Sequence, residues 1–461
     1  MRVQWTALTL LLLISCKEEL PPKDTSDVLT NDGGTVSEDT PEVAEIKPEI
    51  NDTGEPLSEC KLKWNYTVTL GGNANHPVVD KSEITTITTG NACLRVTKSG
   101  AQHCSSPFVG GPDSGIFGAP AQSQDGTIYF GSAKGELYAL TDKCTPRWKS
   151  PVRVVNSDIT GKEALPIRVA PVINGEDIYL LDDRPSLHKC FDNKSNGICG
   201  NGTDSFHFWV NDEPLENAAP AYVGGPTPII VFPTRKKIIA VDPAGSLAWE
   251  FSEFSQSVED QREVNSTIAI TSQRKIVFVG GESLGNGFFK QLQLFRLLPD
   301  SSNLKGVMDL GFPKDIEGLT QDRANALVIG PDNSIYIATN GHGVVKLNAA
   351  GDVKWAYIGE NVSARVTTAP ALGNDGALYF MGEPHYLFGI DSLSRTIHFF
   401  KNPFGGELVT TSPAISDTGL ILVHFGTELM ALKCDSTGLA VSSWPRYQRN
   451  NRASGNSNEQ N

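Results

Sequence analysis

A unit of short strands and turns recurs eight times along this chain and constrains its fold more than any other feature. Each copy opens at an anchor residue and continues with a short apolar strand, a turn and two further apolar strands. The anchors are 43 to 57 residues apart, and self-similarity at this period is typical of a β-propeller. The eight anchors are Pro77, Pro120, Pro171, Pro220, Ile268, Asn325, Pro370 and Pro413.

The turns and strands within each copy suit a propeller blade. Asp125-Gly126 and Asp375-Gly376 follow the first strand in two copies, and these residue types tolerate the backbone of a tight hairpin. The second strand is rich in β-branched and aromatic residues, as in Ile276-Val277-Phe278-Val279. We therefore expect an all-β chain that folds as an eight-bladed β-propeller over residues 60–447.

Six of the seven tryptophans fall at or near the end of an expected fourth strand, and Trp5 lies in the leader. We expect each of the six indoles to pack between neighbouring blades. Trp64 and Trp444 compete for the last blade. We favour Trp64, which makes the N-terminal strand close the ring and leaves Trp444 to pack under it. The six are Trp64, Trp148, Trp209, Trp249, Trp355 and Trp444.

Two of these tryptophans end a more specific pattern. AVDPAGSLAW at residues 240–249 resembles the tryptophan-docking repeat of the pyrroloquinoline-quinone (PQQ) propeller family, and KLNAAGDVKW at residues 346–355 is a looser copy. The resemblance covers roughly residues 61–447 and implies the propeller fold. It does not fix the function, because the family includes quinone dehydrogenases and non-catalytic assembly lipoproteins.

The N-terminus has the layout of an export signal. An apolar run from Ala7 to Ile14 follows Arg2, and it is too short for a transmembrane helix. Residues 13–16, Leu-Ile-Ser-Cys, resemble a bacterial lipobox, which implies a signal peptide over residues 1–15 and a lipid on Cys16. The alternative is an ordinary secretory signal with a chance cysteine. Lys17 after the cysteine favours the outer membrane by analogy with envelope lipoproteins.

Most of the net charge lies in the segment that follows. Residues 17–59 contain 13 acidic residues and 3 lysines, so −10 of the total −14 lies there. This composition does not bury a core, and we expect residues 16–59 to form a disordered tether. The rest of the chain carries −14 − (−10) = −4, and no basic, aromatic surface indicates nucleic acid. We expect residues 448–461 to be a disordered tail, with Arg446, Arg449 and Arg452 in solvent.

Eight cysteines in an exported chain indicate disulfides. Cys16 is assigned to lipid, which leaves seven. Cys60 precedes the strand that would close the ring, and Cys434 ends the third strand of the last copy, so a bond between them would lock the ring. We expect the pairs Cys93–Cys104, Cys190–Cys199 and Cys60–Cys434, with Cys144 left as a buried thiol.

No motif for a cofactor, metal or nucleophile stands out. The eight histidines include no His-x-His or His-Glu-x-x-His pattern, and the adjacent cysteines implied by a quinoprotein alcohol dehydrogenase are missing. Residues 192–197 are similar to a calcium loop, but Lys194 stands where a carboxylate ligand is needed. His342 is expected to be an exposed histidine in a turn. We therefore expect no cofactor and no metal.

Connections that break the repeat indicate where a partner binds, since rigid scaffolds place function on loops. In lipobox, tether and repeat type the chain also resembles the propeller lipoproteins of the outer-membrane β-barrel assembly machinery. We expect a monomeric, lipid-anchored envelope scaffold that binds a protein or glycan through repeats three to six. The alternative is a quinoprotein dehydrogenase or glycan hydrolase with its site in the central funnel. The long connections are 105–117, 191–205, 252–264, 281–290 and 298–322.

Overall fold

A computed structural model describes most of the chain from residue 58 onward, all within the unit Pro48–Asn461. Cys16, the signal peptide and residues 16–57 of the expected tether lie outside the described residues. Every helix or strand among the described residues is a β-strand, and none of those residues forms a helix suited to crossing a membrane. The described residues are 58–68, 75–90, 92–107, 118–154, 164–200, 204–215, 218–252, 262–285, 287–300, 304–357, 366, 368–382, 386–393, 395–403, 411–450 and 452–458.

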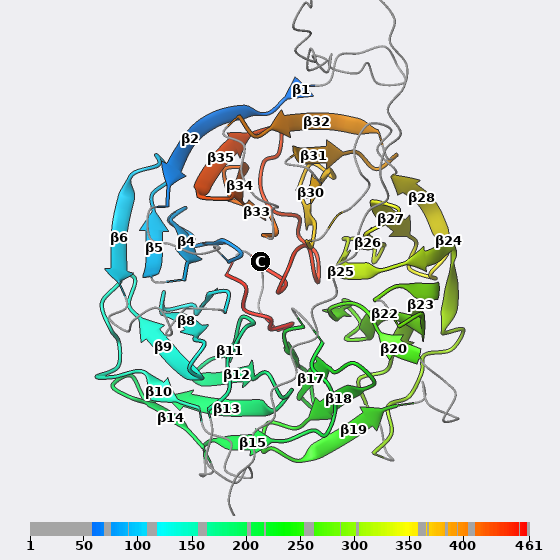
Figure 1. The fold of residues 1–461 in the computed structure, drawn as a ribbon, viewed down its shortest axis with the longest axis horizontal. Helices are drawn as coiled ribbons and strands as arrows, with labels where there is room; N and C mark the ends of the chain where they lie inside the picture. The colour runs from blue at the N-terminus through cyan, green and yellow to red at the C-terminus, as the bar shows by residue number, and fades with distance from the viewer. Residues whose placement is uncertain are drawn as a thin grey trace, which may run out of the picture. The chain divides into compact units, whose positions relative to one another are not determined.

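The described strands form eight sheets arranged around a common centre, so the chain is an eight-bladed β-propeller (Figure 1). Blade 1 contains β3 (Val78–Val79), β4 (Thr85–Thr88), β5 (Ala92–Val96) and β6 (Gln102–Pro107). Blade 2 contains β7 (Ala121–Gln122), β8 (Ile128–Gly131), β9 (Glu136–Leu140) and β10 (Val152–Arg153). Blade 3 contains β11 (Val172–Asn174), β12 (Asp177–Leu181), β13 (Leu187–Asp192), β14 (Gly197–Cys199) and β15 (Phe206–Phe208). Blade 4 contains β16 (Ala221–Val223), β17 (Ile229–Pro233), β18 (Ile238–Val241) and β19 (Leu247–Phe251).

The second half of the ring repeats this order. Blade 5 contains β20 (Arg262–Val264), β21 (Ala269–Ile270), β22 (Ile276–Ser283), β23 (Phe289–Leu297) and β24 (Lys314–Asp322). Blade 6 contains β25 (Ala324–Ile329), β26 (Ile335–Thr339), β27 (Val344–Leu347) and β28 (Val353–Tyr357). Blade 7 contains β29 (Ala371–Leu372), β30 (Leu378–Gly382), β31 (Tyr386–Ile390) and β32 (Thr396–Lys401). Blade 8 contains β33 (Ala414–Ile415), β34 (Leu420–Phe425), β35 (Glu428–Lys433) and β2 (Lys61–Thr67).

The anchors of the sequence repeat mark the first strand of each blade. Pro120 immediately precedes β7 and Pro370 immediately precedes β29, whereas Asn325 is the second residue of β25. These first strands lie nearest the centre, and their apolar side chains are buried. The eightfold register predicted from the sequence is therefore confirmed.

The N-terminal strand closes the ring. β2 pairs antiparallel with β35, which places Trp64 opposite Ala431 in blade 8. Cys60, just before β2, is bonded to Cys434, just after β35, as the sequence predicts. β1 (Ser58–Glu59) pairs parallel with β32 of blade 7, so ordered pairing begins two residues before the expected boundary at residue 60.

Four of the tryptophans dock on the next blade, as expected. Trp64 Nε1 donates to Lys98 O at 2.8 Å, and a Cβ added at Gly100 would lie only 2.8 Å from the Trp64 side chain. A buried indole needs a partner for its N–H, and the next blade supplies it. The other three indoles donate from Trp148 to Asp192 Oδ1 at 2.9 Å, from Trp249 to Pro299 O at 2.9 Å and from Trp355 to Ser392 O at 2.8 Å.

The expected docking between blades is wrong for Trp209, whereas Trp64 and not Trp444 completes the last blade, as favoured from the sequence. Trp209 is 48% exposed, and Phe206 of β15 takes the docking place, since a Cβ added at Gly245 would lie 2.7 Å from its ring. The outer strand of blade 3 is split into β14 and β15, which moves the docking position three residues ahead of the tryptophan. Trp444 lies at the centre of the ring rather than between two outer strands.

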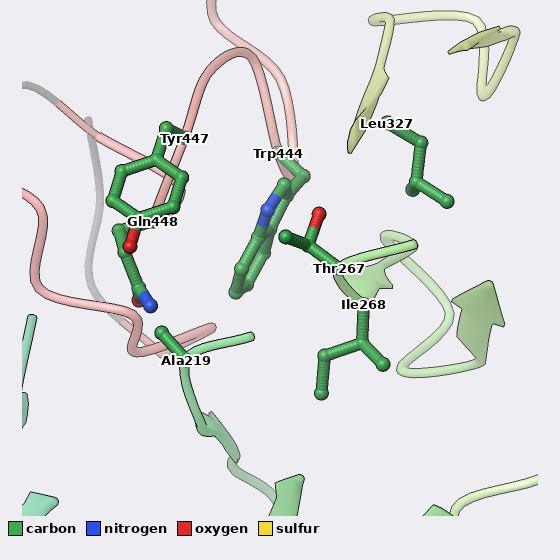
Figure 2. Close-up of a pocket in the computed structure, with 7 residues that line it drawn as sticks. All are labelled: Ala219, Thr267, Ile268, Leu327, Trp444, Tyr447 and Gln448. Carbon is green, nitrogen blue, oxygen red and sulfur yellow. The ribbon is translucent and has the colours of Figure 1, made fainter. Parts of the chain in front are cut away.

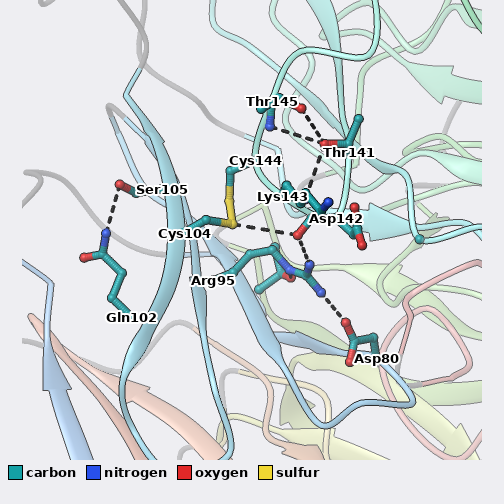
Figure 3. The surroundings of a disulfide bond; sticks show 12 residues. Asp80, Arg95, Gln102, Cys104, Ser105, Thr141, Asp142, Lys143, Cys144 and Thr145 are labelled. Atoms are coloured by element: carbon teal, nitrogen blue, oxygen red, sulfur yellow. Dashed lines mark hydrogen bonds and ion pairs between the residues drawn. A yellow bond between two sulfur atoms is a disulfide. The ribbon is translucent and has the colours of Figure 1, made fainter.

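One predicted disulfide is also wrong. Cys104 is bonded to Cys144 of blade 2 (Figure 3). Cys93 is a buried free thiol. The strand register explains the error, because Cys93 lies opposite Ser106 while Cys104 lies opposite Arg95. The two cysteines are diagonal neighbours, and such Cβ atoms are about 7 Å apart, beyond disulfide range. The Cys190–Cys199 bond is present between directly opposed residues, as expected.

Candidate functional site

The centre of the ring is occupied by the end of the chain itself. After β35 the backbone turns inward, and the described residues near the end of the chain lie at the middle of the propeller (Figure 1). Gln448, Arg449, Ser454 and Asn456 are all buried. The disordered tail predicted over residues 448–461 is therefore wrong for residues 448–450 and 452–458. We call residues 442–458 the central segment.

The central segment is held mainly through its backbone carbonyls. The first strands of five blades each donate an N–H to it, and in four of them the donor is two residues after the anchor. Because these donors are on the innermost strands, they would otherwise face the channel without a strand partner. The five bonds run from Gln122 to Arg452 O (2.9 Å), Ile173 to Ser454 O (3.0 Å), Tyr222 to Gly455 O (2.9 Å), Ile329 to Trp444 O (2.8 Å) and Leu372 to Pro445 O (2.9 Å).

Tyr447 lies among small side chains from blades on opposite sides of the ring. It packs in one buried cluster with four alanines, and the ring of His76 is 4.2 Å from its own. Three of these alanines come immediately before an anchor proline, so the Ala-Pro of the sequence repeat leaves room for the phenol ring. Burial raises the pKa of Tyr447 to about 12. The four are Ala119, Ala170, Ala326 and Ala369.

Arg446 is fully buried, which corrects the expectation that it lies in solvent. Its guanidinium donates to Pro77 O at 2.9 Å and to Asn450 O at 3.3 Å. Burial lowers the pKa of Arg446 to about 10. Burial, and then the charge of Arg446, lower the pKa of His76 to about 3, and His76 Nδ1 accepts from Ser412 N at 2.7 Å. The centre thus holds a cation surrounded by carbonyl dipoles.

A small cavity remains beside the central segment (Figure 2). It has room for about one water molecule, which is too little for a quinone cofactor or a sugar ring. Among the described residues, no group of three or more His, Cys, Asp or Glu side chains could hold a metal ion. The cavity is lined by Ala219, Thr267, Ile268, Leu327, Trp444, Tyr447 and Gln448.

The calcium-like loop of blade 3 is part of a blade-to-blade contact. Asp192 accepts hydrogen bonds from Tyr129 OH, Arg147 Nε, Trp148 Nε1 and Lys194 N. Burial raises the pKa of Asp192, but the hydrogen bonds from Tyr129, Trp148, Lys194 and Arg147 outweigh it and hold the pKa below the usual value. The carboxylate therefore ties blade 2 to blade 3.

His342 is more organised than an exposed loop residue. Its Nδ1 lies 2.6 Å from Oδ2 of Asp322, whose side chain is fully buried, and His342 itself is 28% exposed. Asp322 Oδ1 accepts from the N–H groups of Arg323 and Gly341, which fixes the carboxylate. Sequence spacing could not reveal this pair, because Asp322 ends blade 5 whereas His342 is in a turn of blade 6.

The long connections of the sequence fall on two rims. In each blade the turn between strands one and two lies on the same rim as the turn between strands three and four. On this rim the turn after β29 of blade 7 meets the residues after β35 of blade 8, and Asn374 N donates to Gly438 O. The β13–β14 turn of connection 191–205 and the start of the β23–β24 connection in 298–322 are on this rim, although residues 201–203 and 301–303 lie outside the described part. Connections 105–117, 252–264 and 281–290 are on the other, although residues 108–117, 253–261 and 286 lie outside the described part. The five therefore do not form one surface.

Blade 5 has the longest strands among the described sheets. β22 has 8 residues, and β23 and β24 have 9 each, against 2 to 6 in the strands of the other blades except β2. Large apolar side chains are exposed at both ends of this sheet. Leu284 is in the β22–β23 turn, whereas Leu304 and Leu310 are in the β23–β24 connection, with Leu310 95% exposed.

Comparison with known proteins gives the fold alone. No protein-family model matches the chain, and no curated protein matches it. BamB from Moraxella catarrhalis is 12% identical, with a TM-score of 0.57 over 81% of this chain and 100% of that one. The C-terminal WD40 domain of Sif2 is 11% identical, with a TM-score of 0.58 over 82% and 99%. The Dos1 propeller is 9% identical, with a TM-score of 0.57 over 81% and 95%.

Proposed function

We propose that this chain is a lipid-anchored, non-catalytic scaffold of the cell envelope, which presents the rims of a rigid propeller to a protein or glycan partner. The observation that carries the proposal is the filled centre. Propellers often bind small ligands on their axis, but here Tyr447, Arg446 and Trp444 occupy it. The surface available to a partner is therefore the rims and the outer edges of the blades.

Disulfides hold the ring of blades in one conformation. Such a rigid scaffold suits binding to a partner better than it suits catalysis that requires a lid to open and close. The ring is closed by the Cys60–Cys434 bond, and blades 1 and 2 are joined by Cys104–Cys144. A preformed surface loses little conformational entropy on binding. The partner surface is assigned to blades 3 to 6, where blade 5 has the longest strands and where Trp209 and Leu310 are exposed.

The anchor is assigned to Cys16, with PQQ-type repeats in the propeller. Both assignments rest on the lipobox and the docking repeats of the sequence, and the likeness to BamB supports the propeller fold that carries the repeats. As a flexible coil, the roughly 43 residues after Cys16 would span about 35–40 Å. The propeller would then stand a few nanometres from the membrane, free to reach a partner fixed in it.

Cross-linking followed by mass spectrometry in the native host tests the partner surface. Lysine-reactive cross-links to another envelope protein are expected from Lys236 of blade 4 and Lys290 of blade 5, which are exposed. Exposed Lys61 and Lys63 of blade 8 are the internal control. Cross-links that come only from blade 8 would contradict the assignment to blades 3 to 6.

Two further measurements separate anchoring and catalysis from partner binding. Cys16→Ala should move the protein from the membrane fraction to the soluble fraction, and unchanged fractionation would remove the anchor. Incubation of the purified protein with PQQ and calcium, followed by a dye-reduction assay, tests the alternative of a quinoprotein dehydrogenase. Turnover there would overturn the scaffold proposal while leaving the anchor intact.

A further inference from the structure

We propose that the central channel is a peptide-binding site, which the central segment 442–458 occupies within the same chain. The ligand class is a peptide with several turns that presents backbone carbonyls to the first strands and carries an arginine whose guanidinium donates to a blade carbonyl. This inference does not depend on the envelope role, because it rests only on contacts inside the propeller.

The first reason is that recognition uses the backbone, as in strand addition. Asn456 forms a parallel bridge with Tyr222, and Ser457 N donates back to Tyr222 O at 2.9 Å. Trp444 forms an antiparallel bridge with Ile329 of blade 6. An unpaired strand edge is a template for another chain, and main-chain hydrogen bonds supply much of the affinity in such complexes.

The second reason is that side chains of the segment fit separate places in the channel. The Trp444 indole packs in one cluster with buried residues of blades 4, 5 and 6 (Figure 2). Tyr447 fills the alanine cluster, and the Arg446 guanidinium reaches Pro77 O of blade 1. Asn456 Nδ2 donates to Ile173 O at 3.0 Å and to Asn174 Oδ1 at 3.1 Å. These contacts would give sequence specificity to a backbone-driven site.

The third reason is steric selection near the end of the segment. A Cβ added at Gly455 would lie 2.4 Å from Gln448 Oε1 and 2.7 Å from Val172 Cγ2. The backbone of Gly455 is also in the left-handed region, with φ of 60°, which disfavours a β-branched residue there. A peptide that competes for the channel therefore needs a glycine at this position.

The segment is joined to blade 8 through an exposed point. Val441 is 77% exposed and immediately precedes the central segment. A cut after Val441 would leave every contact described above in place while removing the covalent link. The test can therefore begin from the full-length, folded chain.

The experiment inserts a protease recognition sequence after Val441, cleaves the folded protein and follows the released fragment by gel filtration. The fragment is expected to stay with the propeller, and a fluorescent synthetic peptide of residues 442–461 is expected to replace it at one per propeller. Peptides with Tyr447→Ala or Gly455→Val should compete at least about tenfold more weakly, a difference of about 1.4 kcal/mol. A scrambled peptide is the control for non-specific binding.

Each other outcome has a defined meaning. Release of the fragment from a propeller that stays folded and takes up no peptide would overturn the proposal, as would equal binding of the scrambled peptide. Unfolding on cleavage supports the proposal if the added peptide restores the fold, and overturns it if the peptide does not. A fragment that never exchanges, even in sub-denaturing urea, would be a fixed part of the fold and would also overturn it.

Discussion

Cys104 in the outer strand of blade 1 is bonded to Cys144 in the β9–β10 turn, at the place where Trp64 meets Gly100 one blade earlier. The two turns are equivalent, because Gly100 N donates to Thr97 O and Cys144 N donates to Thr141 O. A covalent bond thus replaces the docking of an indole on a glycine. Arg95 reinforces this seam by bonding both Asp80 of its own blade and Asp142 O of the next (Figure 3).

The first prediction concerns the Cys104–Cys144 bond between blades 1 and 2. Cys104→Ser should lower the free energy of unfolding by up to about 4 kcal/mol, the chain-entropy value for a loop of about 40 residues. The ring is already closed by Cys60–Cys434, so the measured loss should be smaller than this bound. Urea unfolding of the oxidised proteins provides the measurement.

Cys93→Ser is the matched control for Cys104→Ser. Cys93 is buried and free, and burial raises the pKa of its thiol to about 12, so it is an unreactive core residue. Cys93→Ser should leave three disulfides in a non-reducing peptide map and cost less stability than Cys104→Ser. A map that pairs Cys93 with Cys104 in the wild-type protein would contradict the Cys104–Cys144 bond.

The second prediction compares two tryptophans. Trp249→Phe removes the bond to Pro299 O and leaves a buried acceptor unpaired, so it should cost about 2 kcal/mol. Trp209→Phe should change stability by less than about 0.5 kcal/mol, because the Trp209 side chain is half exposed. Equal losses in urea unfolding would mean that docking is not the source of the stability.

The ring and its closure at blade 8 could be predicted because they depend on patterns local to each copy. Pro120 and Pro370 mark the first strands, and an N-terminal strand without three predecessors had to complete the last blade. Cys60 and Cys434 flank the two strands that meet there, so their pairing followed from topology.

The contents of the centre could not be predicted, for a physical reason. Residues 448–458 are rich in Asn, Ser and Arg and have no apolar period, so their composition indicates disorder. Their placement comes from backbone carbonyls, which every sequence possesses, and from N–H groups supplied by the first strands of three blades. The Asp322–His342 pair was missed similarly, because its two members meet across a blade boundary.

The third prediction is that stability falls as the pH is lowered from 8 to 5. Burial, followed by the charge of Arg446, lowers the pKa of His76 to about 3, and burial lowers that of His424 to about 4. Between these values and the unfolded pKa of about 6.5, the unfolded chain binds more protons than the folded one, so stability rises with pH. Each histidine should contribute a loss of about 2 kcal/mol at pH 5. Urea midpoints across this range check the slope.

His76→Gln separates the contribution of the centre from that of other groups. Glutamine retains an acceptor for Ser412 N but does not titrate, so the variant should lose about 2 kcal/mol less stability than the wild type between pH 8 and 5. An unchanged slope would mean that His76 is not held neutral by its burial.

The fourth prediction concerns Tyr447. Tyr447→Ala should cost about 3–5 kcal/mol, because the ring is surrounded by alanines that cannot fill the space it leaves. Val441 is largely exposed and lies three residues before Trp444, the first of the buried residues in the central segment. Val441→Ala should therefore leave the stability nearly unchanged. A loss below about 1 kcal/mol for Tyr447→Ala would contradict the packing of the centre.

Amide hydrogen exchange of the full-length protein, read by mass spectrometry on peptides that cover residues 444–458 and the first strands of blades 2 to 4, tests the filled centre most directly. The account predicts slow exchange at Asn456 and Ser457, whose N–H groups bond within the segment and to blade 4, and equally slow exchange at Gln122, Ile173 and Tyr222 of the first strands. Exchange of these amides at the rate of an unstructured peptide would contradict it.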